Sequence, residues 1–350
     1  KTAYEMLRSL VGSEMCIRDR HITIISDGIP GHVNQSKGVA VLLAQSYPVN
    51  IELHEMVFKI SFLRALFTII AKLLLKKPNR ASAKIVTSFY APLDLKNCDL
   101  IIAAGGKTAP YAAAKSLLSN IPAIQLGSPR GMNSGLFSAL VTVERYFNDP
   151  SNIVASLTPN LYSPESCVRS SIEQGLKEHI LFLIGGEGIG YSYKEHEWES
   201  LVTGIQFMHA VTKLPISIVT SRRSDPRVEK KLRSQLSNIP IDYSAWFHSG
   251  DKDFKLDALL GSAKNIFVTE DSAMMISESI SSGQPVTTLY PSTINSPLRY
   301  QQHITKYVDL GFITRQSIKK FSLKEKINTT KNVEEHLAKL KNKLIERINW

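Results

Sequence analysis

Short apolar runs alternate with amphipathic stretches along most of the chain. Residues 49–57 alternate and fit a half-buried strand, while continuous apolar runs fit buried strands at 21–26, 99–104, 122–126, 139–143, 179–184, 215–220, 243–248 and 286–289. Helical patterns follow several of these strands, at 35–45, 198–211 and 226–236. Repeated succession of strand, loop and helix predicts an α/β fold built on doubly wound parallel sheets.

Residues 265–291 show this repeating unit most completely. Asp271 or Ser272 can cap the helix that follows a short apolar strand, and Gly283 can end it. A helix N-terminus at the carboxyl end of a parallel strand favours phosphate, because its free amides and its dipole attract an anion. Glu278, two turns into the helix, can then reach the hydroxyls of a ribose. An ordinary strand–helix unit without a ligand fits the same pattern.

A glycine-containing turn, DGIPGH at residues 27–32, follows the first strand. It lacks the G-x-G-x-x-G spacing of a dinucleotide-binding loop. We expect Gly28 and Gly31 to lie at a substrate site. His32 is a candidate general base, since an imidazole can accept a proton near neutral pH. An ordinary histidine at the start of a helix is the alternative.

A second loop with adjacent glycines has the sequence GGKT, at residues 105–108. Its Gly-Lys-Thr resembles part of a P-loop, but Ile101 stands where that motif requires its first glycine. The loop is therefore not assigned to nucleoside triphosphate binding. We expect Gly105 and Gly106 to face the same cleft as the first loop.

The second half of the chain has its own glycine-rich turn, GGEGIG at residues 185–190. Such a backbone can approach a ligand closely, although turns of this composition also occur for geometry alone. Ser221 and Arg222 follow the next strand, where an arginine can hold a diphosphate by paired hydrogen bonds. A solvated arginine pair is the alternative. These patterns make Gly185, Gly186, Ser221 and Arg222 candidate binding residues.

Residues 58–77 form the most apolar stretch of the chain, interrupted by Arg64 and Lys72. On a helical wheel the basic and hydroxyl residues fall on one arc, which indicates an amphipathic basic helix and not a membrane span. Two interpretations remain open. The helix is either a core helix with one wet face, or a surface that docks on the inner leaflet of a membrane.

Composition indicates a folded, soluble chain with room for two domains, since 43% of its 350 residues are hydrophobic and 21% are charged. The net charge is +11, and residues 315–350 hold ten Lys or Arg against four Glu, which is six of the eleven. Solvated helix faces explain such runs, as does attraction to an acidic membrane or a phosphorylated substrate. Nucleic acid is not an expected partner, because no nucleic-acid-binding motif accompanies the charge.

The cysteines and the first twenty residues indicate the compartment in which the protein works. Cys16, Cys98 and Cys167 have no metal-binding spacing, and so sparse a set is typical of a reducing, cytoplasmic compartment. Residues 1–20 contain SLVGSEMCIRDR, which resembles a spurious peptide at the ends of many proteins predicted from environmental sequence assemblies. The segment lacks the apolar core and cleavage site of a signal peptide. We expect it to be a non-native or disordered leader.

Several of these motifs together resemble one family. Asp271-Ser272, Ser277-Glu278 and Gly283-Gln284-Pro285 are similar to the donor-site segment of GT-B glycosyltransferases, notably the enzyme that adds N-acetylglucosamine to the lipid-linked peptidoglycan precursor. The match is closer to the family named after a plant mitochondrial-fission protein, whose bacterial members are assigned to the glycosyltransferases. The Ser-Asp-Gly-x-Pro-Gly-His turn and the Thr-Ser-Arg-Arg segment also resemble that family.

The resemblance implies further site residues. Glu144 stands where the family has a glutamate, which makes it a second candidate catalytic residue, although it also fits a surface carboxylate. Phe247 follows the strand whose exit meets the nucleotide base in related folds. Gln301 and Gln302 resemble an Arg-Gln-Gln segment that contacts the donor sugar, and amide side chains can both donate to and accept from hydroxyls.

The resemblance also implies the organisation of the chain. We expect two Rossmann-like domains facing a cleft, with an acceptor domain at 21–160, a donor domain at 161–320 and a basic C-terminal helix at 321–350. A stretch rich in Pro, Ser and Asn at 156–173 is the expected linker.

The implied function is transfer of a sugar from a nucleotide-diphosphate sugar to an unidentified acceptor, for which a lipid-linked or membrane-surface molecule is one candidate. The scheme needs no metal and no cofactor. We expect a cytoplasmic enzyme, with peripheral attachment to the inner membrane as a further expectation. Two alternatives stay open: a non-catalytic interaction protein on the same fold, and a nucleotide-sugar epimerase.

Overall fold

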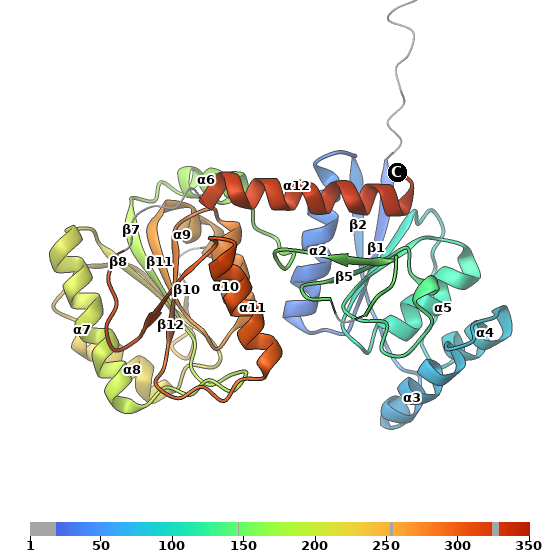
Figure 1. Cartoon of the computed structure of the whole chain (residues 1–350), viewed down its shortest axis with the longest axis horizontal. Coiled ribbons are helices and arrows are strands. Elements are labelled where there is room, and N and C mark those ends of the chain that lie inside the picture. Colours follow the sequence, from blue (N-terminus) through green and yellow to red (C-terminus); the bar gives the residue numbers. More distant parts are fainter. Residues whose placement is uncertain (1–18, 146, 253–254, 324–328) are drawn as a thin grey trace, which may run out of the picture. The chain divides into compact units, whose positions relative to one another are not determined.

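The structure is a computed structural model that describes residues 19–145, 147–252, 255–323 and 329–350 (Figure 1). The expected leader lies outside the described residues up to residue 18, and Arg20 already begins the first strand. The chain forms two compact units. Unit 1 contains the described residues up to Val141 together with Asp149–Asn152 and Leu344–Trp350, and unit 2 contains Thr142–Asn148 and Ile153–Lys343.

The first sheet has six strands in the order β2-β1-β3-β4-β5-β6. The strands are β1 (Arg20–Ser26), β2 (Val49–Glu55), β3 (Leu100–Ala104), β4 (Ala123–Leu126), β5 (Ala139–Thr142) and β6 (Asn152–Val154). The pairs from β2 to β5 are parallel. The helices between them are α2 (Pro30–Ala44), α3 (Arg64–Leu74), α4 (Arg80–Ser88) and α5 (Ala109–Ser119), with short 3-10 turns η1 (Ser61–Leu63) and η2 (Ser134–Leu136). The strand order reverses between β1 and β3, and ligands bind at such switch points.

The second sheet has seven strands in the order β10-β9-β8-β7-β11-β12-β13. They are β7 (His179–Ile184), β8 (Ile216–Thr220), β9 (Ile241–Trp246), β10 (Asp251–Lys252), β11 (Ala263–Thr269), β12 (Val286–Tyr290) and β13 (Thr314–Ser317). In the described part of this sheet, β10 pairs antiparallel with β9, and the other strand pairs are parallel. Omitting β10, the order is that of a Rossmann sheet, with its switch point between β7 and β11.

Helices connect the strands of the second sheet (Figure 1). They are α7 (Glu195–Thr212), α8 (Pro226–Gln235), α9 (Leu256–Ser262), α10 (Ala273–Ser281) and α11 (Leu298–Asp309). α6 (Pro164–Glu173) precedes β7, and α12 (Thr329–Ile348) follows β13. The sequence prediction of an α/β fold with two Rossmann-like sheets is confirmed. The basic C-terminal helix is α12, whose residues belong to unit 2 up to Lys343 and to unit 1 from Leu344.

The central strands of unit 2 are buried along their length. All six residues of β7 are buried, and Phe182 on this strand stacks on Phe267 of β11 with ring centroids 4.9 Å apart. Phe321 contacts both rings from the segment after β13. Removing each such side chain from water stabilises the fold by roughly 1.5–3 kcal/mol. This core fixes the carboxyl ends of β7 and β11, where the candidate binding loops begin.

The expected linker at 156–173 is wrong, because most of it is folded into unit 2. Ser163 and Ser166 form a reciprocal capping box at the start of α6, with Pro164 in the first turn. Asn160 donates to the Ser277 carbonyl and to the Ser281 hydroxyl of α10. Small polar residues and proline are as typical of a helix start as of a linker. The units consequently do not divide at a single boundary near residue 160.

The burial of side chains in α3 distinguishes the two interpretations of the apolar stretch at 58–77. Within α3, Ala71 is the buried residue, and several large apolar side chains are exposed. α3 is therefore not a core helix with one wet face. Across the described part of the chain, no helix has both the length and the apolar content needed to cross a membrane.

Candidate functional site

Three loops meet at the carboxyl edge of the second sheet. They follow β7, β8 and β11, and β7 lies between the other two strands. Because all three strands are parallel, their exit loops emerge at the same edge. The loops carry Gly185, Ser221 and Asp271, so the fold brings together three of the predicted segments.

Asp271 is the centre of this edge. Its side chain is fully buried, and Oδ1 accepts a hydrogen bond of 2.7 Å from the Thr269 hydroxyl, which itself accepts 2.7 Å from the Gly185 amide. Burial raises the pKa of Asp271, against hydrogen bonds from Thr269 and the Gly186 amide and the charge of Arg223. The carboxyl group thus ties the loop after β7 to the loop after β11.

Glycine is required in the first loop by the protein's own packing. A Cβ on Gly185 would lie 2.1 Å from Asp271 Oδ1, and a Cβ on Gly186 would lie 2.1 Å from the Arg223 carbonyl oxygen. Neither distance is compatible with a side chain. The close approach that the glycines allow is therefore made by Asp271 and Arg223.

Arg223, not Arg222, contacts the glycine loop. Arg223 Nη1 donates 2.6 Å to the Asp271 carbonyl and lies 3.5 Å from its Oδ2. Arg222 is exposed. A tight turn at residues 221–224 directs the two arginine side chains differently. In this turn the Ser221 hydroxyl accepts a hydrogen bond from the Arg223 backbone amide, and the Ser224 hydroxyl accepts one from the Ser221 backbone amide. The sequence could indicate an arginine at this place but not which of two neighbours faces the loop.

The α10 N-terminus follows Asp271 directly. Ser272 is its N-cap, and its hydroxyl accepts from the Met275 amide at 3.5 Å. Both predicted features, the cap and the stop at Gly283 with φ of +75°, are confirmed. Glu278 is mostly buried on α10. The pKa of Tyr162 is raised mainly by the burial of Tyr162 and secondly by the charge of Glu278. Its role at a ribose stays a prediction.

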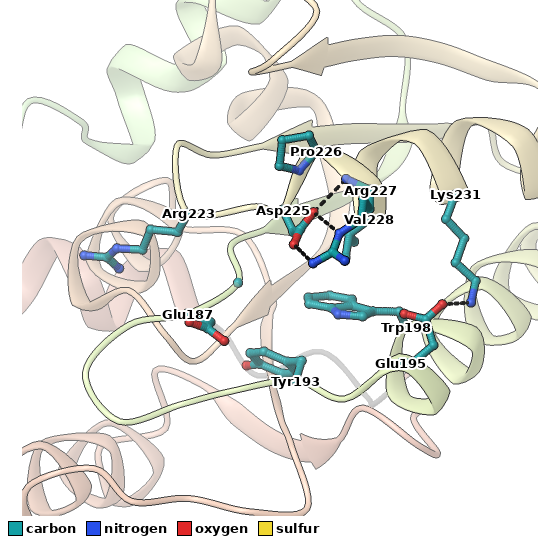
Figure 2. Close-up of a pocket in the computed structure, with 11 residues that line it drawn as sticks. Glu187, Tyr193, Glu195, Trp198, Arg223, Asp225, Pro226, Arg227, Val228 and Lys231 are labelled. Carbon is teal, nitrogen blue, oxygen red and sulfur yellow. Dashed lines mark hydrogen bonds and ion pairs between the residues drawn. The ribbon is translucent and has the colours of Figure 1, made fainter.

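A pocket of about 730 Å³ opens beside the glycine loop. Its lining includes Gly186, Glu187, Tyr193, Trp198 and Arg223, and continues along the first turns of α8. Figure 2 shows Trp198 between Tyr193 and the first turn of α8, and Arg223 extending away from them. Aromatic walls with charged groups above them suit a polar ligand that also has an apolar face.

Most charges in this pocket are paired with one another. Arg227 binds Asp225 through two hydrogen bonds of 3.2 and 2.9 Å, and Lys231 contacts Glu195 (Figure 2). Lys231 also donates to Glu199 at 2.9 Å. Exposed pairs of this kind contribute little to stability. They can be exchanged for ligand contacts at small cost.

Other predicted binding residues of unit 2 line different pockets. Gln301 and Gln302 on α11 line a pocket of about 490 Å³, and the Gln301 amide donates to the Ser296 carbonyl. Phe247 lines a third pocket of about 290 Å³ with Thr220, whose hydroxyl accepts from the Phe247 amide. Gly186, Phe247 and the two glutamines are therefore distributed over three hollows in this unit.

In unit 1 the predicted glycines surround a histidine–aspartate pair. α2 begins at Pro30, so Gly31 and His32 lie in its first turn and not in the preceding loop, because proline suits the first helical position. His32 Nδ1 lies 3.1 Å from both carboxylate oxygens of Asp27. A proton held on Nδ1 by Asp27 leaves Nε2 as the basic nitrogen.

The second glycine loop packs on this histidine. A Cβ on Gly105 would lie 2.4 Å from His32 Cε1, and one on Gly106 would lie 3.2 Å from Arg130 Nε. Gly28 and Gly105 have positive φ of +75° and +86°, which glycine adopts without strain. The two loops therefore meet at the switch point of the first sheet, and Asp27 is the member that sequence reasoning missed.

Glu144 was expected in the same domain as His32, but it lies in unit 2, whereas His32 lies in unit 1. Its Oε1 is 3.8 Å from His303 Nδ1 and 3.8 Å from Lys306 Nζ, both on α11. Lys306 also donates to the Val143 and Ala155 carbonyls, which holds this segment against α11. Burial and the charge of Lys306 lower the pKa of His303 to about 4. No sequence motif indicated this cluster, because Glu144 is more than 150 residues away from His303 and Lys306 along the chain.

A second buried pair also escaped the sequence analysis. Arg315 on β13 binds both carboxylate oxygens of the fully buried Glu270 at 2.8 and 2.9 Å, and the Thr288 hydroxyl donates to the same carboxylate. The Tyr193 hydroxyl accepts from the Glu270 amide. This network supports the loop after β11 from behind. Among the described residues, no cluster of His, Cys, Asp or Glu could hold a metal ion.

Two doubly wound sheets with glycine loops at both switch points define an α/β protein of GT-B-like fold. The chain belongs to the mitochondrial fission ELM1 family, whose sequence profile matches residues 30–339. The uncharacterized protein RP120 of Rickettsia prowazekii is 28% identical over 137 residues, which are 38% of this chain and 37% of that protein. The chain thus matches little more than a third of the length of that curated relative.

Two solved structures are similar to this chain. A crystal structure from Listeria monocytogenes, assigned as a UDP-N-acetylglucosamine 2-epimerase, matches with a TM-score of 0.50 at 10% identity, over 95% of this chain and 90% of that one. The ADP-heptose lipopolysaccharide heptosyltransferase II of E. coli also matches, with a TM-score of 0.42 at 12% identity, over 94% and 98% of the two chains. At such identities the likeness concerns the fold alone.

Proposed function

We propose that the protein transfers a glycosyl unit from a nucleotide-diphosphate sugar to an acceptor. The observation that carries the proposal is the convergence, at the switch point of the second sheet, of the glycine loop, Arg223 and the N-terminus of α10. A guanidinium and a helix dipole are suited to a diphosphate, and both stabilise the negative charge that develops on it as the sugar leaves. The proposal needs no cation for this step.

The buried Asp271 has to be reconciled with an anionic ligand. An ionised carboxylate beside a diphosphate would repel it. Burial raises the pKa of Asp271, which favours the neutral form, and an approaching diphosphate would raise it further. In this scheme Asp271 is a positioning residue that holds the glycine loop and Arg223, while Ser272 caps the helix that faces the phosphates.

The remaining binding roles follow the same proposal. Phe247 beside the pocket at Thr220 would contact the base, Glu278 the ribose, and Gln301 with Gln302 the sugar. In unit 1, Asp27 would keep the His32 proton on Nδ1, so that Nε2 can remove the acceptor hydroxyl proton. Gly28, Gly31, Gly105 and Gly106 would allow the acceptor to approach this nitrogen.

For the acceptor, the proposal names a class of molecule and not a particular compound. We infer a cytoplasmic enzyme attached peripherally to a membrane, with an acceptor that is lipid-linked or lies at the membrane surface. The excess of basic residues in the chain supports this setting.

A thermal-shift screen with uridine, guanosine, cytidine and thymidine diphosphate-sugars tests the proposal. A ligand that binds only the folded state raises the Tm. We expect one nucleotide family to raise the Tm, and we expect the sugar to stay on its nucleotide until an acceptor is supplied. Release of free sugar without an acceptor would instead support a hydrolysing epimerase, and the absence of any shift would contradict the enzyme proposal.

A further inference from the structure

α3 and the turn before it expose a continuous apolar stripe. Four large side chains at spacings of four, three and four residues lie on one face of the helix, and their exposed fractions are 83% for Phe62, 50% for Leu66, 57% for Ile69 and 56% for Leu73. Phe62 is the most exposed large apolar side chain among the described residues. Single exposed apolar residues are common, but an ordered row of them marks an interaction surface.

The opposite side of α3 packs against the rest of unit 1, and the stripe therefore faces solvent. Phe67 stacks on Phe89 with ring centroids 4.4 Å apart and planes at 5°, and Ala71 is buried. The Leu75 carbonyl accepts from the Asn133 amide, which anchors the end of the helix. α4 packs on both α3 and α5, and Figure 1 shows α3 and α4 side by side at the edge of unit 1.

The charge around the stripe has a single sign. Residues 56–93 contain no Asp or Glu and seven basic residues, namely Lys59, Arg64, Lys72, Lys76, Lys77, Arg80 and Lys84. Six of the seven are exposed, and Lys72 is half-buried. α3 ends at Leu74, and Lys76 and Lys77 lie in the turn that follows it, three and four residues after Leu73. The surface therefore combines an exposed apolar stripe with charged side chains that are all basic.

We propose that residues 56–93 form a docking surface for a bilayer that contains anionic lipids. An interfacial helix of this kind places its apolar face in the boundary between headgroups and acyl chains, and its basic residues on the anionic headgroups. A second copy of the chain fits poorly, because a two-fold interface would place this cationic surface against itself. Nucleic acid would satisfy the charges and leave the aliphatic row unused.

This inference deepens the membrane part of the proposed function, since it names the surface and the lipid class. It does not depend on sugar transfer. Vesicle binding is measured without any nucleotide-sugar, so the docking surface and the transferase proposal can each fail alone.

Vesicle cosedimentation of the full chain tests the proposal, with vesicles of phosphatidylcholine alone and of phosphatidylcholine mixed with phosphatidylglycerol. We expect binding to the mixed vesicles that weakens as salt is added. The double variant Phe62→Ser/Ile69→Ser should bind at least about tenfold more weakly, because two inserted side chains are lost. Lys76→Gln/Lys77→Gln should bind more weakly by about fivefold per charge.

The matched control is Phe207→Ser/Val211→Ser on α7, where two large apolar side chains of similar exposure, 55% and 57%, are also four residues apart. This control should bind vesicles like the unaltered chain, and circular dichroism should show all variants folded. Equal loss of binding in the control and the stripe variant would overturn the proposal. So would equal binding to vesicles without anionic lipid, or a dimer in size-exclusion chromatography that only the stripe variant abolishes.

Discussion

At the residue scale, the glycine loop of unit 2 shows how one side chain shapes a site. Asp271 fills the space beside Gly185 and, with its carbonyl, fixes Arg223. The sequence motif indicated glycines, an acid and an arginine in the right order. It could not show that the glycines accommodate Asp271, because that contact joins loops more than 80 residues apart.

The neighbouring arginines give a paired test of the donor site. We predict that Arg223→Ala weakens binding of the nucleotide-diphosphate sugar identified by thermal shift by at least about tenfold, because a charge-assisted hydrogen bond to a phosphate is lost. Arg222→Ala is the control and should change the Kd by less than about threefold, since this side chain points to solvent. Isothermal titration calorimetry measures both. The reverse order would restore the original assignment of the clamp to Arg222.

His303 gives a pH test of the cluster on α11. Its pKa of about 4, against 6.5 for an ordinary histidine, means that the unfolded chain binds this proton first as the pH falls. In the folded chain, His303 faces Glu144 and Lys306. Because its folded pKa is the lower one, the stability that neutral His303 contributes is complete above pH 6.5 and is lost as the pH falls toward 4.

We therefore predict that His303→Gln reduces the loss of unfolding free energy between pH 7 and pH 5 by about 2 kcal/mol, by the linkage of 1.36 kcal/mol per pKa unit. Urea unfolding at both pH values measures the difference. His196→Gln, on the first turn of α7 at the surface, is the control and should follow the unaltered chain. An unchanged pH dependence in His303→Gln would show that His303 is not the group responsible.

At the element scale, strands and helices with a strong apolar period were predictable, and those held by tertiary contacts were not. β7, β11 and α10 were predicted because each is an apolar run between turn residues. β13 was missed because its residues, TRQS, are polar and the strand depends on the Arg315–Glu270 pair. α6 was read as linker, because its serines and proline act here as a helix cap.

The pair that holds β13 can be tested by removing one partner. We predict that Arg315→Met lowers the free energy of unfolding by about 3 kcal/mol, because it leaves Glu270 buried without its cation. The double variant Arg315→Met/Glu270→Gln should recover part of the loss, since no buried charge remains. Urea unfolding at neutral pH measures all three proteins. A loss below about 1 kcal/mol in Arg315→Met would mean that water or Thr288 already satisfies Glu270.

At the scale of the whole molecule, the fold followed from the order of its repeated units, but the site did not. The successive strand–loop–helix units predicted two doubly wound sheets, and both sheets have switch points with glycine loops. Four of the predicted binding residues of unit 2 nevertheless line three separate hollows, namely Gly186, Phe247, Gln301 and Gln302. Sequence motifs locate loops at a sheet edge, whereas the direction of each side chain depends on packing between distant segments.

The proposed sugar transfer requires a diphosphate bound at the switch point of the second sheet. Amide hydrogen exchange of the full chain, with and without the nucleotide-sugar that raises the Tm most, tests this directly. We predict slower exchange at residues 185–190, 221–224 and 270–276 when the ligand is present, because their amides become covered. Unchanged exchange in these three segments, with protection elsewhere in the chain, would contradict the account.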